Sequence, residues 1–381
     1  MDQQQSSSSS PRKHKSVVGP VSTTPGRHSF TVNGHVFEVP RRYTVSKLVG
    51  MGAYGVVCAG HDAKTNARVA IKKCHSVFRD VGDCKRVLRE VKLLLFFHHE
   101  NLLGVRSFFL GGPVDRFTDV YVVTDLYDTD LNTVVRSRQN ISEEHMKYFM
   151  YQLLRGLKFI HTAGVMHRDL KPANLLVNIN CDLRICDFGL ARGVDVDVDN
   201  KHFTDYVVTR WYRPPELLLM NTSYTTSVDV WSAGCIFAEL AARKPVFMGR
   251  DYVTQLRLVC EAVGTPDESE TTQFLQSQAS IDFLKAMPPC PGRPLSYLAP
   301  TLDDCGLDFL SKMLQFNPAK RWTAAQLMAH PYLATLHDEA DEPCSPSLFS
   351  WPHDQTDDLS IDDLRSLFAA EAVAFPDDAL M

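Results

Sequence analysis

The chain changes its hydrophobic pattern once, and this change restricts the fold more than any other feature of the sequence. Short segments rich in β-branched residues, with turn residues between them, occupy residues 43–50, 55–60, 68–73 and 119–126. Runs of this kind favour β-strands. One helical stretch, residues 84–97, interrupts them, and helical spacing dominates from residue 142 onward. A strand-rich part followed by a helical part predicts an α+β fold.

The helical part opens with a clear start signal. Ser142 is a good N-cap residue, and Glu143 and Glu144 follow in the first turn, where acidic side chains complement the helix dipole. Gly164 is placed to end the helix. Helical spacing connects the apolar residues between these signals, namely Met146, Phe149, Met150, Leu153, Leu154 and Leu157.

The composition excludes several classes of protein. The 381 residues include 44% hydrophobic and 22% charged residues, as in an ordinary globular protein. The formal net charge of -5 gives no case for nucleic acid binding, and no run approaches the roughly 18 apolar residues of a membrane span. The ten cysteines include no C-x-x-C pair, which indicates reduced thiols in an intracellular protein. We therefore expect neither a nucleic acid nor a membrane as partner.

Residues 1–30 form a Gln/Ser/Pro-rich segment with few large apolar residues. Such a segment cannot bury enough surface to offset its ordering entropy, so we predict a disordered tail. Its basic run, Arg12–Lys15, is either a solvated stretch or a nuclear or docking signal.

A glycine-rich segment, Gly50-Met51-Gly52-Ala53-Tyr54-Gly55, matches G-x-G-x-x-G. The pattern alone also occurs in dinucleotide-binding folds, where a helix follows the glycines. Here a strand, a polar turn and a second strand follow instead. A strand-loop-strand hairpin can offer backbone N–H groups to phosphates, because glycine lets the backbone approach closely.

Lys72 lies in the apolar V-A-I-K segment, and Glu90 lies on the one helix of the strand-rich part. A lysine here could simply point outward from a sheet. Alternatively, Glu90 reaches inward to Lys72 and the pair holds the ammonium group against nucleotide phosphates. Such an ion pair adds little net stability, so its role would be positioning.

Two further motifs follow, His167-Arg168-Asp169 with Asn174, and Asp187-Phe188-Gly189. Together with the glycine segment and V-A-I-K, their order resembles the protein-kinase signature, from about Tyr43 to Leu333. The resemblance implies a bilobal protein-kinase fold over residues 43–333, with a small antiparallel β lobe at 43–126 and a larger, mainly helical lobe at 127–333.

The resemblance also implies the site. Asp169 would accept the proton of a substrate hydroxyl, Lys171 would contact the transferred phosphate, and Asn174 and Asp187 would bind Mg²⁺. Lys171 at this place is typical of Ser/Thr kinases. ATP would contact the glycine loop, V-A-I-K, the hinge and the ribose site through Val49, Gly50, Met51, Gly52, Ala53, Tyr54, Gly55, Val56, Val57, Lys72, Glu90, Thr124 and Asp130.

Thr204-Asp205-Tyr206 precedes Pro214-Pro215-Glu216 and matches the T-x-Y activation loop of mitogen-activated protein kinases. The resemblance implies phosphorylation of Thr204 and Tyr206 by an upstream dual-specificity kinase, and substrates with Ser or Thr before Pro. The phosphates would be held by Arg89, Arg168 and Arg192 for Thr204, and by Arg210 and Arg213 for Tyr206. We also expect Glu216 to pair with Arg321.

Residues 334–381 resemble the common-docking segment and C-terminal extension of this family, which packs back on the small lobe. Asp338, Asp341 and Glu342 are the expected docking acids for basic motifs of activators, substrates and phosphatases. A solvated acidic surface is the alternative. We further expect a monomer in cytoplasm and nucleus.

Three other interpretations stay open on the sequence. The stretch 76–103 is similar to nemo-like kinases, which lack the activating Tyr and the docking acids. A cyclin-dependent type would carry a cyclin-binding helix at residues 84–92 and a single activating Thr. A catalytically idle docking scaffold, or pseudokinase, is disfavoured because Lys72, Asp169, Asn174 and Asp187 are all present.

Overall fold

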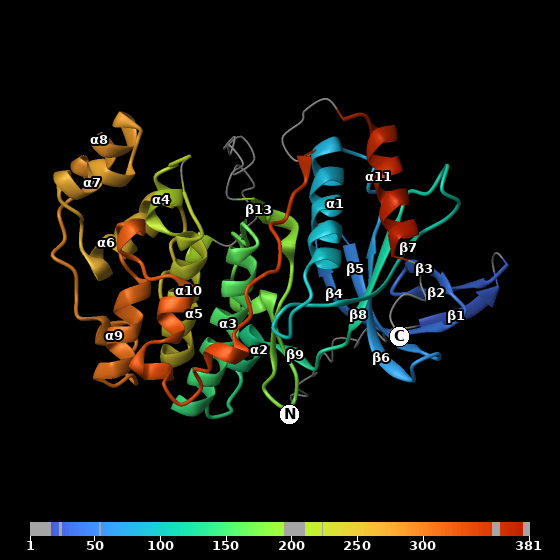
Figure 1. Cartoon of the computed structure of the whole chain (residues 1–381), viewed down its shortest axis with the longest axis horizontal. Helices are drawn as coiled ribbons and strands as arrows, with labels where there is room; N and C mark the ends of the chain where they lie inside the picture. Colours follow the sequence, from blue (N-terminus) through green and yellow to red (C-terminus); the bar gives the residue numbers. More distant parts are fainter. Residues whose placement is uncertain are drawn as a thin grey trace, which may run out of the picture. The chain divides into compact units, whose positions relative to one another are not determined.

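The computed structural model describes residues 17–22, 25–52, 55–193, 210–222, 224–352 and 359–375. The chain divides into two compact units. The strand-rich unit spans residues 1–83, 105–126 and 365–381, and the helical unit spans residues 84–104 and 127–364 (Figure 1). The division passes through two helices, α1 (Val81–Phe96) and α11 (Ile361–Ala374). The predicted α+β fold class is confirmed.

The strand-rich unit contains a five-stranded antiparallel sheet in the order β4-β5-β6-β8-β7. Its strands are β4 (Tyr43–Gly52), β5 (Gly55–Asp62), β6 (Ala67–Cys74), β7 (Val105–Leu110) and β8 (Val120–Asp125). The β4–β5 hairpin carries the glycine segment, and β6 carries Lys72 between β5 and β8. The predicted phosphate-binding residues therefore lie on adjacent strands of one sheet.

A second sheet, in the order β1-β2-β3, corrects the prediction of a disordered tail for residues 17–22 and 25–30, and residues 1–16 lie outside the described part of the chain. Its strands are β1 (Val17–Ser22), β2 (Arg27–Val32) and β3 (His35–Pro40). Asn33 and Gly34 both have positive φ, as the two-residue turn that joins twisted strands requires. Pairing with β3 helps to bury Phe30 and Val32 of β2, whereas the valines of β1 stay exposed. The turn signal Asn33-Gly34 could have revealed the β2–β3 hairpin.

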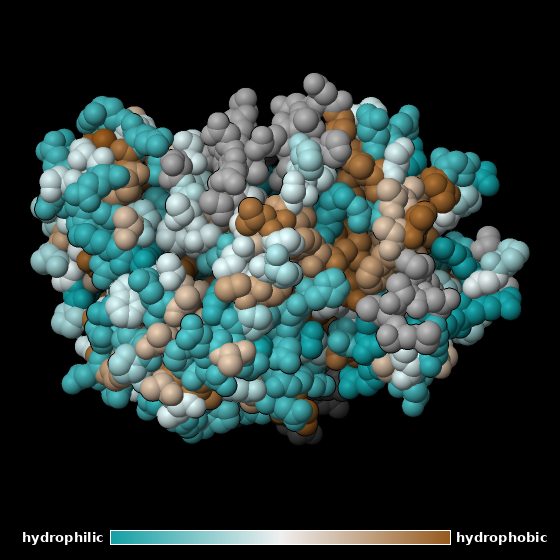
Figure 2. Space-filling view, in the orientation of Figure 1, coloured by the Kyte–Doolittle hydropathy of each residue, from teal (hydrophilic) through white to brown (hydrophobic). Residues whose placement is uncertain are grey.

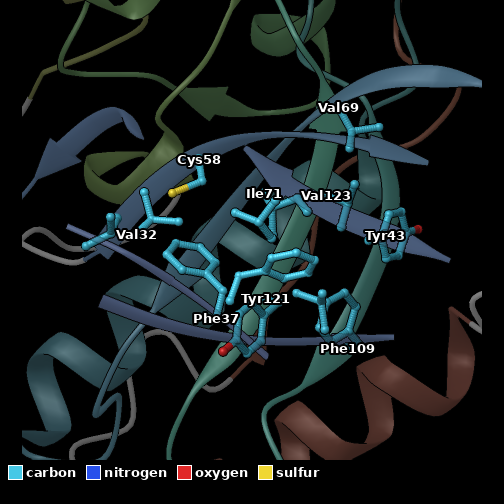
Figure 3. Close-up of a cluster of buried hydrophobic side chains, with 13 residues drawn as sticks. Val32, Phe37, Tyr43, Cys58, Val69, Ile71, Phe109, Tyr121 and Val123 are labelled. Atoms are coloured by element: carbon cyan, nitrogen blue, oxygen red, sulfur yellow. The ribbon is translucent and has the colours of Figure 1, made fainter. Parts of the chain in front are cut away.

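The core of the strand-rich unit lies between these two sheets. Phe30, Val32, Phe37 and Val39 come from the smaller sheet, and Tyr43, Cys58, Val69, Ile71, Phe109, Tyr121 and Val123 from the larger one. Figure 3 shows their side chains gathered into one cluster. A polar anchor joins the same two sheets, because Lys73 Nζ donates to the Val36 carbonyl at 2.7 Å.

The turn after β5 is fixed by Asp62, which is almost fully buried. Burial alone would raise the pKa of Asp62, but hydrogen bonds from Arg42, Thr65 and the Lys64 N–H outweigh this effect and hold the pKa at about 2. The Arg42 guanidinium makes two of these bonds, at 2.6 and 3.0 Å. The ionised carboxylate therefore stabilises the fold at neutral pH.

The helical unit is built around α3 (Glu143–Thr162), which packs on α5 (Ser227–Ala242) and α10 (Ala324–Met328). The predicted cap is present, because the Ser142 hydroxyl accepts from the His145 N–H. Gly164, with a φ of 74°, follows the helix end as predicted. The remaining helices are α2 (Leu131–Arg136), α4 (Pro215–Leu218), α6 (Tyr252–Val263), α7 (Glu268–Phe274), α8 (Gln278–Ala286) and α9 (Asp304–Met313).

Short strands beside α3 frame the predicted catalytic loop. They are β9 (Thr129–Asp130), β10 (Val165–Met166), β11 (Leu175–Val177), β12 (Leu183–Ile185) and β13 (Arg192–Gly193). β10 pairs with β13, and β11 pairs with β9 and β12. The segments that carry Asp169 and Asp187 are thereby held at both ends.

The last described helix returns to the strand-rich unit. Phe368 of α11 is fully buried, and its ring lies 5.9 Å from the Phe78 ring in an edge-to-face contact. The Arg365 guanidinium lies 4.5 Å from the centroid of the Phe78 ring. These contacts involve the family-like C-terminal extension that the sequence places over residues 334–381.

The visible surface of the helical unit is covered mainly by hydrophilic residues, with apolar ones scattered between them (Figure 2). Among the described residues, no helix combines the length and the apolar character that crossing a membrane would require.

Candidate active site

A buried carboxylate, Asp229 of α5, fixes the start of the predicted catalytic loop. It accepts the backbone N–H groups of His167 and Arg168 at 2.8 Å each, and His161 Nε2 lies 2.9 Å from it. Burial alone would raise the pKa of Asp229, but the His161 contact and the backbone donors hold it below its usual value. Arg168 adopts a φ of 69°, a strained conformation that these bonds help to maintain.

Sequence reasoning missed Asp229. The signal was its place beside Val228, Val230 and Trp231 in a mainly apolar helix. A charged residue among buried neighbours needs hydrogen-bond partners, so this position was a candidate for a structural clamp.

Asp169 lies at the centre of the candidate site and is mostly buried. Lys171 Nζ lies 2.6 Å from its Oδ2, and Asn174 Nδ2 donates to the same atom at 3.1 Å and to the Asp169 carbonyl at 2.9 Å. Burial raises the pKa of Asp169, Lys171 opposes this, and the negative charge of Asp187 adds to it. The structure thus brings these four predicted residues into one electrostatic cluster.

Asp187 is exposed, although the residue that follows it is fully buried. The Phe188 ring lies 5.1 Å from His167 and 5.4 Å from Phe97. His167 Nε2 also lies 3.0 Å from the Cys186 carbonyl. The buried Phe188 anchors the segment, so that Asp187, with a φ of 69°, can stay at the surface of the cluster.

The donor set of this cluster suits a hard divalent cation. Asp187 offers an exposed carboxylate, and Asn174 uses its amide nitrogen on Asp169, which leaves its amide oxygen as the atom able to bind a metal. Mg²⁺ prefers such oxygens and usually takes only one or two carboxylates when phosphates complete its shell. In the described part of the chain, no group of three or more His, Cys, Asp or Glu side chains is placed to hold a metal.

The predicted nucleotide-binding residues of the strand-rich unit lie on β4, β5, β6 and β8. Gly50 pairs with Val57, Met51 with Val56 and Gly52 with Gly55. Space is open where a Cβ would stand on Gly50 or Gly52, whereas a Cβ on Gly55 would clash with the Lys73 carbonyl. The first two glycines therefore leave room above the hairpin, and the third is required by the neighbouring strand. Val49 is exposed, and Ala53 and Tyr54 lie outside the described residues.

The other nucleotide-site residues occupy both units. Lys72 and the buried Thr124 belong to the strand-rich unit, and the buried Glu90 belongs to the helical unit, so the Lys72–Glu90 ion pair stays a prediction. Asp130 caps α2, where its Oδ1 accepts the Thr133 N–H at 2.9 Å. This cap fixes Asp130 on a rigid element.

Three of the arginines predicted to hold phosphate lie beside two tyrosines, Tyr224 and Tyr252. The Arg168 guanidinium lies 5.4 Å from the Tyr224 ring. Burial raises the pKa of Tyr224, and the charges of Arg168 and Arg192 both oppose this rise.

The second pair of arginines surrounds Tyr252. Arg210 and Arg213 lie 5.5 and 5.8 Å from its ring, and Arg213 Nη1 donates to its hydroxyl at 2.6 Å. Thr204 and Tyr206 lie outside the described residues. Arg89 is buried on α1.

The predicted Glu216–Arg321 ion pair is present and fully buried. Two bonds of 2.6 and 2.7 Å join the guanidinium to both carboxylate oxygens. Arg321 also donates to the carbonyls of Gln315, Ser227 and Phe316. The pair connects α4, which follows the predicted activation loop, to the end of the kinase-like core.

The expected docking acids are not equivalent. Asp338 and Asp341 are exposed, and Asp341 makes a 2.8 Å ion pair with Arg155 of α3. Glu342 is 4% exposed and bonds His337 at 2.7 Å, with Lys158 at 3.7 Å. The docking role expected for these acids stays a prediction, and the Glu342 carboxylate faces partners within the chain.

These features together define a protein kinase, and comparison with known proteins agrees. The family model described as "Protein kinase domain" matches residues 43–333. The chain is 47% identical to mitogen-activated protein kinase 6 of Arabidopsis thaliana, over 91% of this chain and 86% of that protein. It is 46% identical to mitogen-activated protein kinase 5 of Oryza sativa subsp. indica, over 93% and 95% of the two chains. Mitogen-activated protein kinase 3 of Arabidopsis thaliana is also 46% identical, over 91% and 92%.

The chain belongs to the protein kinases and, within them, to the mitogen-activated protein kinase family. It is a serine/threonine protein kinase that uses ATP. The prediction of the enzyme class is confirmed, and interactions with an upstream kinase and with protein substrates follow from the family.

Proposed function

We propose that this kinase transfers the γ-phosphate of Mg·ATP to Ser or Thr followed by Pro, and that phosphorylation of Thr204 and Tyr206 switches it on. The observation that carries the catalytic part is the buried Asp169 carboxylate, contacted by Lys171 and Asn174 at 2.6 and 3.1 Å.

Asp169 is the proton acceptor in this proposal. Its Oδ atoms orient the substrate hydroxyl and take its proton, a role supported by a pKa that burial raises. Lys171 neutralises charge on the transferred phosphate. Asn174 and Asp187 would hold Mg²⁺, which supplies neutralisation of the phosphate charge. The clamp by Asp229 keeps Asp169 in place, because a misplacement of about 1 Å can cost roughly 100-fold in rate.

The nucleotide would lie under the β4–β5 hairpin. The open space beside Gly50 and Gly52 supports a close approach of phosphates to the backbone. Lys72, held by Glu90, would contact the α- and β-phosphates, and Thr124 and Asp130 would lie beside the adenine and the ribose.

The switch is an electrostatic one. Each phosphate adds about -1.5 to -2 charge, and charge-assisted hydrogen bonds contribute roughly 1.5–3 kcal/mol each. A near-complete population shift needs about 5.5 kcal/mol, which two phosphates with two or three such bonds each can supply. The position of Arg210 and Arg213 beside the same Tyr252 ring supports one phosphate site, and the position of Arg168 beside Tyr224 supports a second one.

The proposed protein partners include an activating kinase and proteins that bind the exposed acids after the kinase core. A dual-specificity kinase would activate the protein, and basic docking motifs of activators, substrates and phosphatases would bind the exposed Asp338 and Asp341. We propose that the protein acts as a monomer in cytoplasm and nucleus.

A peptide assay tests the catalytic proposal. With Mg·ATP, the doubly phosphorylated enzyme should phosphorylate a Ser-Pro peptide and leave the matched Ser-Ala peptide nearly unmodified. Asp169→Asn and Asp187→Ala should abolish the reaction. Equal rates on the two peptides would refute the proline requirement, and an active Asp169→Asn would refute the assigned proton acceptor.

Mass spectrometry and activity together test the switch. The active form should carry phosphate on both Thr204 and Tyr206, and Thr204→Ala and Tyr206→Phe should each stay far below the doubly phosphorylated enzyme. Full activity in either variant after treatment with an activating kinase would show that two phosphates are not required.

A further inference from the structure

A serine after the docking acids carries the acceptor sequence of the proposed reaction, because Ser345 is followed directly by Pro346. Residues 343–349, named the Ser345 segment below, belong to no helix or strand. Ser345 is half-buried and Pro346 is exposed. The Ser345 hydroxyl donates to the Ser347 carbonyl at 2.8 Å, within its own turn. The acceptor hydroxyl and the proline therefore lie in an irregular surface segment, the kind of segment that a second protein can reach.

Two backbone hydrogen bonds hold the Ser345 segment at the end of α3. The Ser345 N–H donates to Thr162 Oγ1 at 2.9 Å, and the Phe349 N–H donates to the Ala163 carbonyl at 2.8 Å. The Phe349 ring adds an edge-to-face contact, 5.4 Å from the Phe96 ring. A hydrogen bond of this kind shifts an opening equilibrium by about two- to tenfold. The segment can therefore leave α3 by local opening, while the rest of the helical unit stays folded.

A second Ser/Thr-Pro pair among the described residues, Thr265-Pro266, is built into the fold. The Thr265 hydroxyl accepts the Cys290 N–H at 3.0 Å, and the Thr265 N–H donates to the Cys290 carbonyl at 2.9 Å. The Arg293 N–H extends this pairing to the Ala262 carbonyl at 3.0 Å. The hydroxyl of Thr265 thus takes part in a paired structure that must open before a kinase can use it. The same dipeptide pattern has two different structural settings in one chain.

We propose that Ser345 is a phosphorylation site and that an active copy of this kinase modifies it in trans. The inference rests on the proposed function, because it uses the specificity for Ser or Thr before Pro. The Ser345 Oγ attacks the γ-phosphorus of ATP, the bond from this phosphorus to the β–γ bridging oxygen breaks, and ADP leaves. The hydroxyl proton passes to Asp169 of the copy that acts as the enzyme.

The anchors on both sides of the Ser345 segment favour a second copy as the enzyme. Glu342 and Trp351 are both buried, at 4% and 7% exposure. Three residues span at most about 10 Å, so Ser345 stays close to α3 as long as Glu342 is held. The active site of another copy can approach the segment without releasing these anchors.

The phosphate would act locally. The chain from Asp341 to Ser345 follows one face of α3, with contacts from Asp341 to Arg155, from Glu342 to Lys158 and from Ser345 to Thr162. The first and last of these helix positions lie about 10 Å apart, roughly one Debye length, so salt largely screens the phosphate from Asp341. At the end of α3 the helix carbonyls carry partial negative charge, and an added anion is unfavourable there. Phosphorylation of Ser345 therefore releases the Ser345 segment from α3.

The test uses an inactive copy as the substrate, so that only the added enzyme can transfer phosphate. Active kinase, standardised on the Ser-Pro peptide, is mixed with Mg·ATP and an isotopically labelled Asp187→Ala copy. Mass spectrometry then follows each site of the labelled copy. Ser345 should be phosphorylated, and Thr265 should be modified at least about tenfold more slowly. Adding Ser345→Ala to the labelled copy should remove the signal, and adding Pro346→Ala should lower it as strongly as the change from the Ser-Pro to the Ser-Ala peptide.

The heat-denatured labelled copy is the matched control, because unfolding exposes both pairs. It should accept phosphate on Thr265 as well as on Ser345. A native copy with the same ratio of the two sites as the denatured copy would overturn the inference, and an Asp169→Asn copy repeats the comparison with a different inactivating change. Phosphate on Ser345 of the active copy alone would place the reaction in cis and overturn the assignment to a second copy.

The peptide standard separates the inference from the proposed function. An enzyme that phosphorylates the Ser-Pro peptide but leaves Ser345 unmodified would refute the inference alone. An enzyme that does not phosphorylate the peptide, or does not require its proline, would refute the proposed function itself.

Hydrogen exchange tests the release of the segment. After phosphorylation of Ser345, the Phe349 N–H should exchange about tenfold faster, because its bond to Ala163 opens more often. Amides in the middle of α3 should keep their exchange rates. The Ser345→Ala form, treated in the same way, should keep slow exchange at Phe349. Unchanged exchange at Phe349 with Ser345 fully phosphorylated would overturn the proposed effect of the phosphate.

Discussion

Replacing Asp229 by Asn tests whether one buried carboxylate holds the catalytic loop in place. The carboxylate faces three donors, the N–H groups of His167 and Arg168 and the Nε2 of His161. An amide of nearly the same shape has one acceptor oxygen and one NH₂ group. Asp229→Asn therefore places a donor against a donor at one or more of these contacts.

The expected loss of stability in Asp229→Asn can be estimated from those three contacts. Each charge-assisted bond contributes roughly 1.5–3 kcal/mol, and a buried donor left without an acceptor costs about 1–3 kcal/mol. We expect Asp229→Asn to lower the free energy of unfolding by about 3–5 kcal/mol, a large part of the stability of a typical domain. Because Asp169 follows Arg168 directly, kcat should fall about 100-fold.

Urea unfolding and peptide phosphorylation measure the two effects. The pKa of Asp229 lies below its usual value, so its contribution is present at neutral pH and is lost as the pH falls through the acid range. The difference between wild type and Asp229→Asn should therefore shrink at low pH. Equal unfolding midpoints at pH 7, or an unchanged kcat, would refute the clamp.

Glu239 provides the matched control on the same helix. It is equally buried, but burial raises the pKa of Glu239 and it accepts one bond, from the Tyr212 hydroxyl at 2.6 Å. The amide oxygen of Gln can accept this bond as well. Glu239→Gln should therefore change the free energy of unfolding by no more than about 1 kcal/mol.

Three more outcomes are expected. Lys171→Met removes a contact that lowers the pKa of Asp169, so the acid limb of the kcat/KM profile should move to higher pH; an unmoved limb would contradict this contact. Asp62→Asn should lose about 2 kcal/mol of stability at pH 7, and its urea midpoint should meet that of wild type as the pH falls from 4 to 2, since the pKa rises from about 2 to 3.8 on unfolding. Arg321→Met should cost about 3–5 kcal/mol in urea unfolding by stranding Glu216, and adding Glu216→Met should recover part of this loss.

The sequence by itself determined the features that depend on neighbours along the chain. The Ser142 cap, the end near Gly164 and the strand-turn-strand reading of the glycine segment all depend on local periodicity and turn chemistry. The order of the motifs around Asp169 and Asp187 indicated the enzyme class, because phosphoryl transfer needs these residue types at these spacings.

Only the tertiary structure decided which residues, distant in sequence, support the catalytic and docking segments. Asp229 lies 62 residues from the His167 N–H that it accepts, and Arg155 lies 186 residues from Asp341. Nothing in local spacing marks such pairs.

The tertiary structure also decided which acidic side chains are buried. Glu342 and Asp341 are adjacent acids, yet Glu342 is buried and Asp341 is exposed, and the folded chain brings the distant Lys158 close to Glu342. A linear pattern records which side chain is charged, but the three-dimensional packing determines whether water or another residue meets that charge.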